Sequence, residues 1–442
     1  MRRHWAGILF LVCMALPFVF ALRQGRAVQA SPDEVIVILS PHNREVKAEY
    51  SRAFAAYMAR EQHRNVGIRW LDVGGASRCL KELESRFKAT PDHVGVDILF
   101  GGGVDPYLRA KRLGWLSPVL MTDDAKTAIP AECGGFPVYD PDGSWYGVAL
   151  SSFGIIRNAA MTETLGLPDA MEWEDLALPE YATWVAGGDP RSSGSVHACY
   201  EIILQAYGFE KGWRLIAQMC ANVRQFGEDG GDAPRTVASG DAAAGMVIGQ
   251  YAERIIKSIG DERLAYALPS GTTVINPDAI AVIKNGPNPG LAALFVQFCL
   301  TDEGQRILFQ PAGKNGQAQP LYRMPVRAEL YADADAPHVA PYSYRARFSY
   351  DSELGDRRWT IVNDCIGSWL IDPHADLVAA WARVRAAGCP REAVEALFAP
   401  PCSESEMADL AKNWKDATRA DTRIRWSQEA PARYRSIRPP EQ

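Results

Sequence analysis

The sequence predicts a two-lobed α/β protein in which a second α/β unit interrupts the first. Strand-like and helix-like segments alternate from residue 35 onward, and the strand-like runs are short and apolar, as in strands buried on both faces of a sheet. A run at residues 274–282 follows the second unit and is expected to return to the first. Each lobe should hold a mixed, mostly parallel sheet flanked by helices, with a ligand cleft between the lobes. The length of 442 residues suits two or three such cores.

The first unit follows a βαβαβ pattern. Strands are expected at residues 35–39, 68–73 and 96–100, and helices between them at 46–58 and 80–87, where apolar residues recur at helical spacing. This order predicts parallel strands with right-handed crossovers. A further strand at residues 146–150, continued through 153–156, leads into the second unit.

The second unit and the tail complete the expected layout. Strands are expected at residues 181–186, 223–226 and 244–248, with a helix following Ser195 and another at residues 291–298. The tail is expected to be helical, and its last twenty or so residues, rich in Arg, Glu and Pro, to lie loosely on the surface. The expected division is a leader at 1–30, lobe 1 at 31–154, lobe 2 at 155–272, a return to lobe 1 at 273–325 and a helical extension at 326–442 packing on the lobes.

The first thirty residues resemble an export signal. Arg2 and Arg3 precede an uncharged, mostly apolar run at residues 8–22, and the segment ends at Ala30 after Val28 and Gln29. The pattern predicts a signal peptide cleaved near Ala30 and hence a periplasmic protein. An uncleaved membrane anchor is the alternative, although the run is shorter than the roughly 20 apolar residues that a spanning helix needs.

Charge and cysteine content narrow the possible partners. The formal net charge is −6, and removing the leader, which holds four arginines and no acid, makes the chain more acidic still. A chain without a basic stripe is a poor candidate for binding nucleic acid, because Lys and Arg contacts to phosphates carry that binding. Eight cysteines follow the leader without a CxxC pair, so no disulfide is assigned.

The strongest local signal is the segment DPRSSGS at residues 189–195, which opens a helix after a predicted strand. The first N–H groups of a helix are unpaired and carry the positive end of the helix dipole, and Ser193 and Ser195 add hydroxyl donors beside Gly194. This combination suits a phosphate, a carboxylate or a carbonate. The alternative is an ordinary capping turn with Ser192 or Ser193 as N-cap.

Three loops of the first unit are expected to reach the same cleft, because ligands of open α/β sheets bind beyond the strand ends. The candidate ligand contacts in these loops are Ser40, His42, Gly75, Ser77, Gly102 and Gly103. Plain tight turns are the alternative for each loop. The triple glycine at residues 101–103 lacks the Lys-Ser/Thr of a P-loop, so it is no nucleotide motif.

Three further side chains are candidates for the site. His42 is a candidate metal ligand or hydrogen-bond donor to an anion, and Tyr251 could donate its phenol or ligate ferric iron as a phenolate. Asp278 is either a ligand contact or a turn cap. Catalytic patterns such as HExxH, GxSxG and paired Cys/His zinc spacings are absent from the sequence, which argues against an enzyme.

Taken in order, several segments resemble family 1 extracellular solute-binding proteins of ABC importers, and most closely their ferric-iron-type subgroup. The segments are VIVILSPH, DILFGGG, WYGVALSSFGIIRN, DPRSSGS, INPDAIAVIKN and FVQFCLTDEGQRIL, within residues 33–320. The resemblance implies a type II periplasmic-binding-protein fold that closes on its ligand about a hinge. It also implies delivery of the ligand to an ABC permease in the inner membrane.

The resemblance to the iron-binding subgroup is incomplete. Its members use a His after the first strand, a Glu after the third, a tyrosine pair in the second lobe and a synergistic anion at a helix start. His42 and Tyr251 match two of these positions, but Gln250 stands beside Tyr251, and glycines at 101–103 occupy the place of the Glu. Ferric iron with a synergistic anion, and a phosphorylated or carboxylated organic anion, both stay open as the cargo.

The leading interpretation is a monomeric periplasmic solute-binding protein that captures a small anion or ferric iron and performs no chemistry. It needs no cofactor of its own, since Fe(III) would be cargo. Two alternatives stay open: an exported enzyme on the same scaffold, and a ligand-sensing subunit that docks on a receptor.

Overall fold

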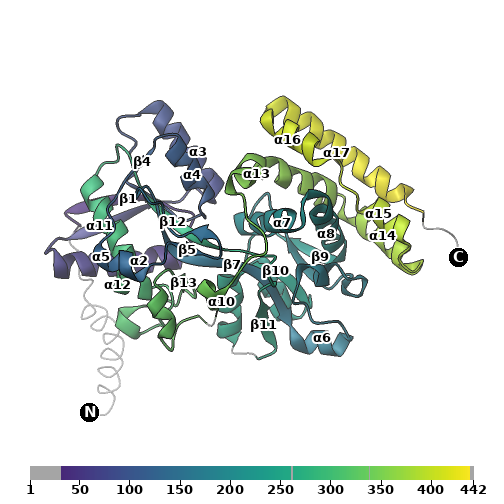
Figure 1. Ribbon diagram of the computed structural model, residues 1–442, viewed down its shortest axis with the longest axis horizontal. Coiled ribbons are helices and arrows are strands. Elements are labelled where there is room, and N and C mark those ends of the chain that lie inside the picture. The colour runs from purple at the N-terminus through teal and green to yellow at the C-terminus, as the bar shows by residue number, and fades with distance from the viewer. Residues whose placement is uncertain (1–30, 260–261, 338, 439–442) are drawn as a thin grey trace, which may run out of the picture.

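The computed structural model describes residues 31–259, 262–337 and 339–438 (Figure 1). The predicted leader at 1–30 lies outside the described residues. Within the described part of the chain, no helix combines the length and apolar character needed to cross a membrane.

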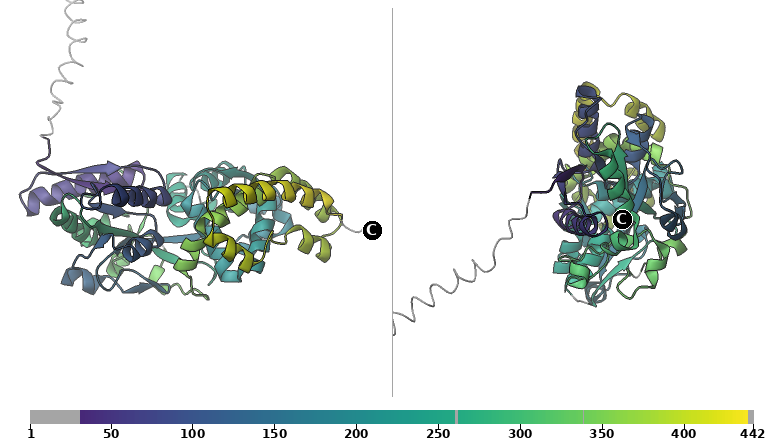
Figure 2. Two further views of the ribbon diagram at one scale, coloured as in Figure 1. Left: turned by 90° about the horizontal axis from the view of Figure 1, so that it is seen from above. Right: turned by 90° about the vertical axis from the view of Figure 1, so that its left-hand side faces the viewer.

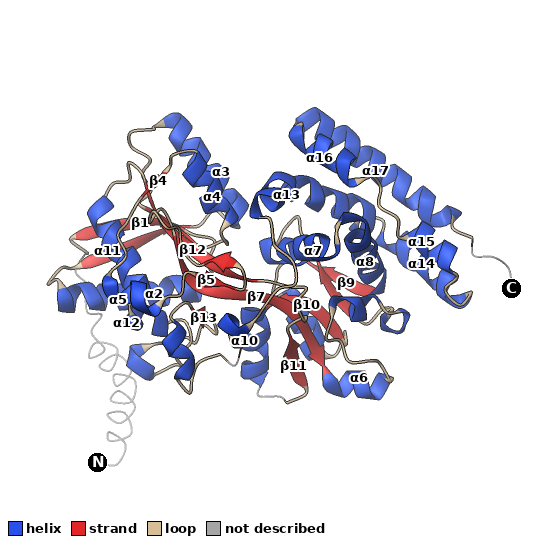
Figure 3. Cartoon of the chain, viewed as in Figure 1, coloured by secondary structure: helices blue, strands red, loops and turns tan. Residues whose placement is uncertain are grey.

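One continuous sheet of eleven strands runs through the molecule, with helices on its faces (Figure 3). Its main strands, in spatial order, are β2 (Val66–Leu71), β1 (Glu34–Leu39), β3 (Ile98–Phe100), β12 (Ile275–Ile283), β7 (Tyr146–Asn158), β10 (Ala244–Ile248), β8 (Val185–Gly188) and β9 (Val223–Gly227). The outer pairs at each end are parallel, and the pairs around β12 and β7 are antiparallel. This arrangement confirms the predicted two-lobed α/β fold.

The long strand β7 belongs to both lobes. Its residues 146–152 pair with β12 of lobe 1, and its residues 153–157 pair with β10 of lobe 2. The pairing partner therefore changes between Ser152 and Phe153. The chain crosses again after β11 (Leu264–Ala267), which pairs with the lobe 2 half of β7 before β12 returns to lobe 1. The lobes thus share a strand instead of meeting at a flexible linker.

Helices of lobe 1 surround a core rich in aromatic side chains. They are α2 (Arg44–Glu61), α3 (Ala76–Ala89), α4 (Asp105–Arg112), α5 (Asp123–Ala128), α11 (Pro289–Leu300) and α12 (Asp302–Arg306). Short strands β4 (Leu116–Ser117), β5 (Glu132–Cys133), β6 (Phe136–Pro137) and β13 (Met324–Pro325) lie at its margins. Asn43 caps α2 by accepting a hydrogen bond from the Val46 amide. In the core, the rings of Phe54 and Phe295 meet edge to face, 4.9 Å apart.

Helices of lobe 2 are α6 (Ala159–Leu165), α7 (Gly194–Tyr207), α8 (Phe209–Asn222), α9 (Asp232–Ser239) and α10 (Gly249–Ile259). The strand expected at residues 181–186 is partly wrong, because β8 begins only at Val185. Tyr181 instead ends a short 3₁₀ turn (Pro179–Tyr181), and its hydroxyl donates to the Pro168 carbonyl. In the sequence, a buried tyrosine in such a turn cannot be told from a buried residue at the start of a strand, because both are apolar positions.

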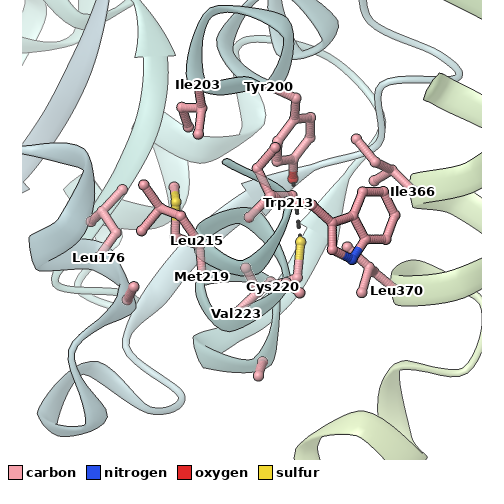
Figure 4. Close-up of a cluster of buried hydrophobic side chains, with 14 of the residues drawn as sticks. Leu176, Tyr200, Ile203, Trp213, Leu215, Met219, Cys220, Val223, Ile366 and Leu370 are labelled. Carbon is pink, nitrogen blue, oxygen red and sulfur yellow. Dashed lines mark hydrogen bonds between the residues drawn. The ribbon is translucent and has the colours of Figure 1, made fainter. Parts of the chain in front are cut away.

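The C-terminal helices complete the core of lobe 2. They are α13 (Ser352–Ile366), a π-helical turn (Gly367–Ile371), α14 (His374–Ala386), α15 (Arg391–Leu397), α16 (Glu404–Lys412) and α17 (Asp416–Ser436), and they cover one end of the molecule (Figure 2). Figure 4 shows Trp213 of α8 lying against Ile366 and Leu370 from this segment. These helices are therefore part of the lobe and share its hydrophobic core.

The expectation of a loose C-terminus is wrong. Trp426, Ala430 and Tyr434 recur every four residues along α17 and are almost fully buried. The Tyr434 hydroxyl also donates to the carbonyl of Trp369 at 2.7 Å. The apolar stripe is narrow and lies among many charged residues, so the composition of the segment conceals it.

All eight cysteines in the described residues are free thiols. Six of them are buried, and burial raises their pKa values. Cys220, for example, lies 3.7 Å from the Tyr200 hydroxyl inside the lobe 2 core (Figure 4). Buried thiols of this kind act as small apolar side chains.

Two buried polar contacts fix α13 onto α7. Arg358 makes a two-pronged ion pair with Glu201, with its Nη2 2.8 Å from Oε1. His197 Nδ1 lies 2.6 Å from Asn363 Oδ1. Burial lowers the pKa of His197 to about 4, so the side chain is neutral in the folded protein near neutral pH.

This histidine predicts a loss of stability in mild acid. The unfolded chain takes up a proton on His197 near its ordinary pKa of 6.5, whereas the folded protein resists protonation down to about pH 4. The free energy of unfolding should therefore fall as the pH drops from 6.5 toward 4. Urea unfolding at pH 7 and pH 5 measures the effect, and His197→Gln should reduce the difference between the two pH values. If the free energy of unfolding of His197→Gln decreased between pH 7 and pH 5 by as much as that of the wild type, the assignment to His197 would be wrong.

Candidate functional site

A cleft of about 290 Å³ lies between the lobes and is lined by residues from both. Lobe 1 supplies the loops that follow β1 and β3 and the start of α3, and lobe 2 supplies the starts of α7 and α10 and the loop before α9. Nine residues predicted from the sequence line this cleft: His42, Gly75, Gly102, Gly103, Ser193, Gly194, Ser195, Tyr251 and Asp278.

The N-terminus of α7 opens directly into the cleft. Its N-cap is Ser193, and within the described residues the Ser193 side chain makes no capping hydrogen bond. The Ser193 hydroxyl instead lies 3.2 Å from that of Ser195. Ser192 does not cap the helix either, because its hydroxyl donates to the carbonyls of Asp189 and Glu228. The helix start therefore presents N–H groups and two hydroxyls to the same space.

Gly230 keeps that space open. A Cβ atom at this position would lie 2.3 Å from Ser195 Oγ, 3.0 Å from Tyr251 Cε2 and 3.4 Å from Ser193 Oγ. The backbone of the loop before α9 thus comes close to both serines and to the tyrosine ring. Any side chain at Gly230 would enter the region in front of α7. We call this group, made of Ser193, Gly194, Ser195, Gly230 and Tyr251, the serine cradle.

Across the cleft, Asp278 is the centre of a buried polar cluster. Its Oδ2 lies 2.7 Å from both His42 Nε2 and Arg323 Nη1. Its Oδ1 accepts from the amides of Gly102 at 2.7 Å and Gly103 at 3.4 Å. Burial alone would raise the pKa of Asp278, but these contacts outweigh burial and lower it well below 3.8. The carboxylate therefore holds the glycine loop after β3 in place.

His42 faces this carboxylate. Burial lowers the pKa of His42, and the neighbouring Asp278 opposes that shift. The ring contacts Asp278 through Nε2, whereas its Nδ1 is buried without a hydrogen-bond partner among the described residues. The ring is thus held by its contact with the carboxylate.

Two other predicted contacts have different positions. Ser40 is fully buried and accepts a hydrogen bond from the His42 amide at 3.1 Å, so it supports the loop and does not line the cleft. Ser77 lies in the first turn of α3, but its side chain lies outside what the structure describes.

The model of the family described as bacterial extracellular solute-binding protein matches residues 107–329. The chain belongs to this extracellular solute-binding family. Membership supports the predicted export and the expectation of a binding protein, since its relatives are solute-binding and transport proteins. Cleavage near Ala30 stays a prediction.

Curated relatives of this solute-binding protein match only in part. A phosphoglycerate transport regulatory protein, PgtC, of Salmonella typhimurium is 29% identical over 161 residues, which is 36% of this chain. An uncharacterized protein of Haemophilus influenzae is 25% identical over 231 residues, or 51% of this chain and 64% of that protein. The match spans only 40% of the length of PgtC.

Solved structures show the same fold over most of the chain. The periplasmic binding protein AfuA of Actinobacillus pleuropneumoniae, with fructose-6-phosphate bound, has a TM-score of 0.59 at 21% identity and covers 76% of this chain and 98% of its own. Iron-bound HitA of Pseudomonas aeruginosa has a TM-score of 0.51 at 18% identity and covers 70% of this chain and 94% of its own. At these identities the likeness shows the fold alone.

Among the cleft residues that sequence reasoning missed are Gly230, Arg323 and Trp359. Gly230 follows β9 within a glycine pair, so the rule that ligands bind beyond strand ends could have found it. Arg323 and Trp359 lie far along the chain from the other lining residues, and no local pattern marks either of them. In the described residues of the solute-binding protein, no three His, Cys, Asp or Glu side chains are grouped so as to hold a metal ion.

Proposed function

We propose that this protein captures a small phosphorylated organic anion in the cleft and delivers it to an ABC permease in the inner membrane. The observation that carries the proposal is the serine cradle, where the uncapped start of α7, two hydroxyls and an open glycine backbone meet inside the cleft. Phosphate oxygens are strong acceptors, and a helix N-terminus supplies both N–H donors and a favourable dipole.

The chemistry of the relatives supports a phosphorylated ligand. PgtC is named for phosphoglycerate transport, and AfuA was solved with fructose-6-phosphate. Several donors converge on one small region of the cradle, which suits a group with three acceptor oxygens better than a carboxylate with two.

The same contacts argue for an organic anion in preference to ferric iron. His42 Nε2 is occupied by Asp278, and Gln250 stands where the iron-binding relatives implied by the sequence resemblance have a second tyrosine. Iron cargo would give the loaded protein a visible tyrosinate absorption band that Tyr251→Phe removes. We expect the purified protein to show no such band after incubation with ferric citrate.

Capture would use the shared strand as the hinge. The ligand would touch lobe 1 through the glycine loop and lobe 2 through the serine cradle, while β7 connects the two between Ser152 and Phe153. The ligand can shift the equilibrium toward the closed state only by as much as it binds that state more tightly than the open state. The monomeric protein would then present the closed form to the permease.

A variant without both cradle hydroxyls tests the proposed function. Ser193→Ala/Ser195→Ala should weaken binding of 3-phosphoglycerate or fructose 6-phosphate by about 30-fold, because hydrogen bonds to a charged ligand are lost. Isothermal titration calorimetry measures the affinity, and thermal melting should show an unchanged Tm. Ser258→Ala, on the exposed side of α10, is the matched control. Unchanged affinity in the double variant would exclude the cradle as the anion site.

A ligand-sensing subunit is the second candidate function, because PgtC is described as a transport regulatory protein. The same cleft would bind the ligand in a sensing protein. A strain that lacks this protein and expresses the permease from a constitutive promoter distinguishes transport from sensing. Loss of uptake in that strain supports transport. Uptake that persists under that promoter, together with loss of ligand-induced transcription, supports sensing.

A further inference from the structure

Helix α13 adds one residue, Trp359, to the cleft. This residue lies beyond residue 329, where the match to the family model ends. Its ring stands beside the serine cradle, since a Cβ atom at Gly194 would lie 3.6 Å from Trp359 Cζ2. The C-terminal helices thus contribute to the binding site as well as to the lobe 2 core.

A second cavity of about 140 Å³ adjoins this ring, between α3, α4 and α13. Its wall carries three acids, Glu84, Asp105 and Asp356, and two cationic side chains, Lys81 and Arg109. Arg109 already lies 3.7 Å from Glu84, so the cavity offers more acceptors than free cations. Only Ala76 and Trp359 line both cavities. Because Ala76 is already small, the indole of Trp359 is the side chain that separates the two spaces.

The indole is held firmly in this position. The ring of His197 lies against it, with 3.7 Å between the ring centroids. The helix is fixed to lobe 2 by the buried Arg358–Glu201 pair. It also contacts lobe 1 through Arg112 of α4, whose guanidinium reaches Glu353 at 3.2 Å and Asp356 at 3.4 Å in partly exposed ion pairs. Since α13 contacts both lobes, the ring lies where they meet.

We infer that Trp359 is a specificity-determining residue that limits the length of the bound ligand. The inference rests on the proposed function: the phosphate sits in the serine cradle, and the indole closes the route from the cradle to the second cavity. Short phosphorylated acids fit within the main cleft. A longer molecule would have to pass the ring to bring an uncharged, hydroxyl-bearing end to the carboxylates of the second cavity.

Removing the ring should join the cavities and change the length preference. The probes are inorganic phosphate, 3-phosphoglycerate and trehalose 6-phosphate, whose second sugar makes it longer without adding charge, titrated calorimetrically into the full-length mature protein. For Trp359→Ala, the ratio of the Kd of trehalose 6-phosphate to that of 3-phosphoglycerate should fall by about tenfold or more. Inorganic phosphate contacts only the cradle, so its Kd should change by less than about threefold. Trp359→Leu serves in the same way if the alanine variant does not fold.

Two control variants distinguish a barrier between the cavities from a general role of the ring in the fold. Trp359→Phe keeps an aromatic ring and should keep the wild-type ratio. Trp414→Ala removes a different indole of the C-terminal helices, one that donates to Asp364 of α13, and should also leave the ratio unchanged. An unchanged ratio in Trp359→Ala, or an equal change in Trp414→Ala, overturns the inference while the proposed function stands. A wild-type protein that binds none of the three probes overturns both.

Discussion

Replacing Asp278 with asparagine should lower the free energy of unfolding by about 3 to 5 kcal/mol. The carboxylate is buried and serves His42, Arg323 and the Gly102 amide at once. The amide keeps the shape of the side chain but removes its charge, which leaves the buried Arg323 guanidinium without a counter-charge. Chemical denaturation with urea at pH 7 measures the change.

The control for this prediction is Asp409→Asn, which removes the partner of Lys412 in an ion pair whose side chains are both more than two-thirds exposed. Its effect should stay within about 0.5 kcal/mol. Acid provides a second check. The unfolded chain protonates Asp278 near 3.8, while the folded protein holds its pKa well below that value. The free energy of unfolding of the wild type therefore decreases as the pH drops below 3.8, and its difference from that of Asp278→Asn becomes smaller there. A small difference between the two proteins at pH 7 would contradict the assignment.

Replacing Gly230 with alanine should weaken binding of 3-phosphoglycerate by more than about 100-fold. The new methyl group would lie 2.3 Å from Ser195 Oγ and 3.0 Å from the Tyr251 ring, so it fills the space in front of α7. The loss is larger than for the double serine variant, because the methyl occupies the space itself and also crowds both hydroxyls. Calorimetry measures the affinity.

The neighbouring glycine supplies the matched control. A Cβ atom at Gly231 would meet only the ends of the Arg235 and Asp229 side chains, and Gly231 does not line the cleft. Gly231→Ala should therefore keep the affinity within about threefold of the wild type. If Gly230→Ala binds 3-phosphoglycerate as tightly as Gly231→Ala, the ligand does not occupy the serine cradle.

Sequence patterns locate the elements of this fold and the loops of its cleft well. Apolar runs mark β1, β10 and β12, and the small residues after each strand mark loops that the structure brings to one place. The prediction works because carboxyl ends of parallel strands share one edge of a sheet. It is less accurate at residues 181–186, where a buried tyrosine in a 3₁₀ turn has the apolar character of a strand.

The roles of side chains depend on contacts between distant residues and are harder to read. The position of Asp278 in the chain suggests a ligand contact, but its oxygens bind other residues of the protein. These are His42, Gly102 and Arg323, which lie 236, 176 and 45 positions away, respectively. Trp359 reaches the cleft only because α13 crosses from lobe 2 toward α4. Neither relation has a local pattern, since packing of whole helices creates both.

The position of α17 has a consequence for how the protein matures. Trp426, Ala430 and Tyr434 enter the interior of a lobe that begins more than 250 positions earlier in the chain. The core of that lobe is therefore completed only after α17 has left the ribosome. A chain cut before α17 would leave the apolar surface beneath this helix exposed to water.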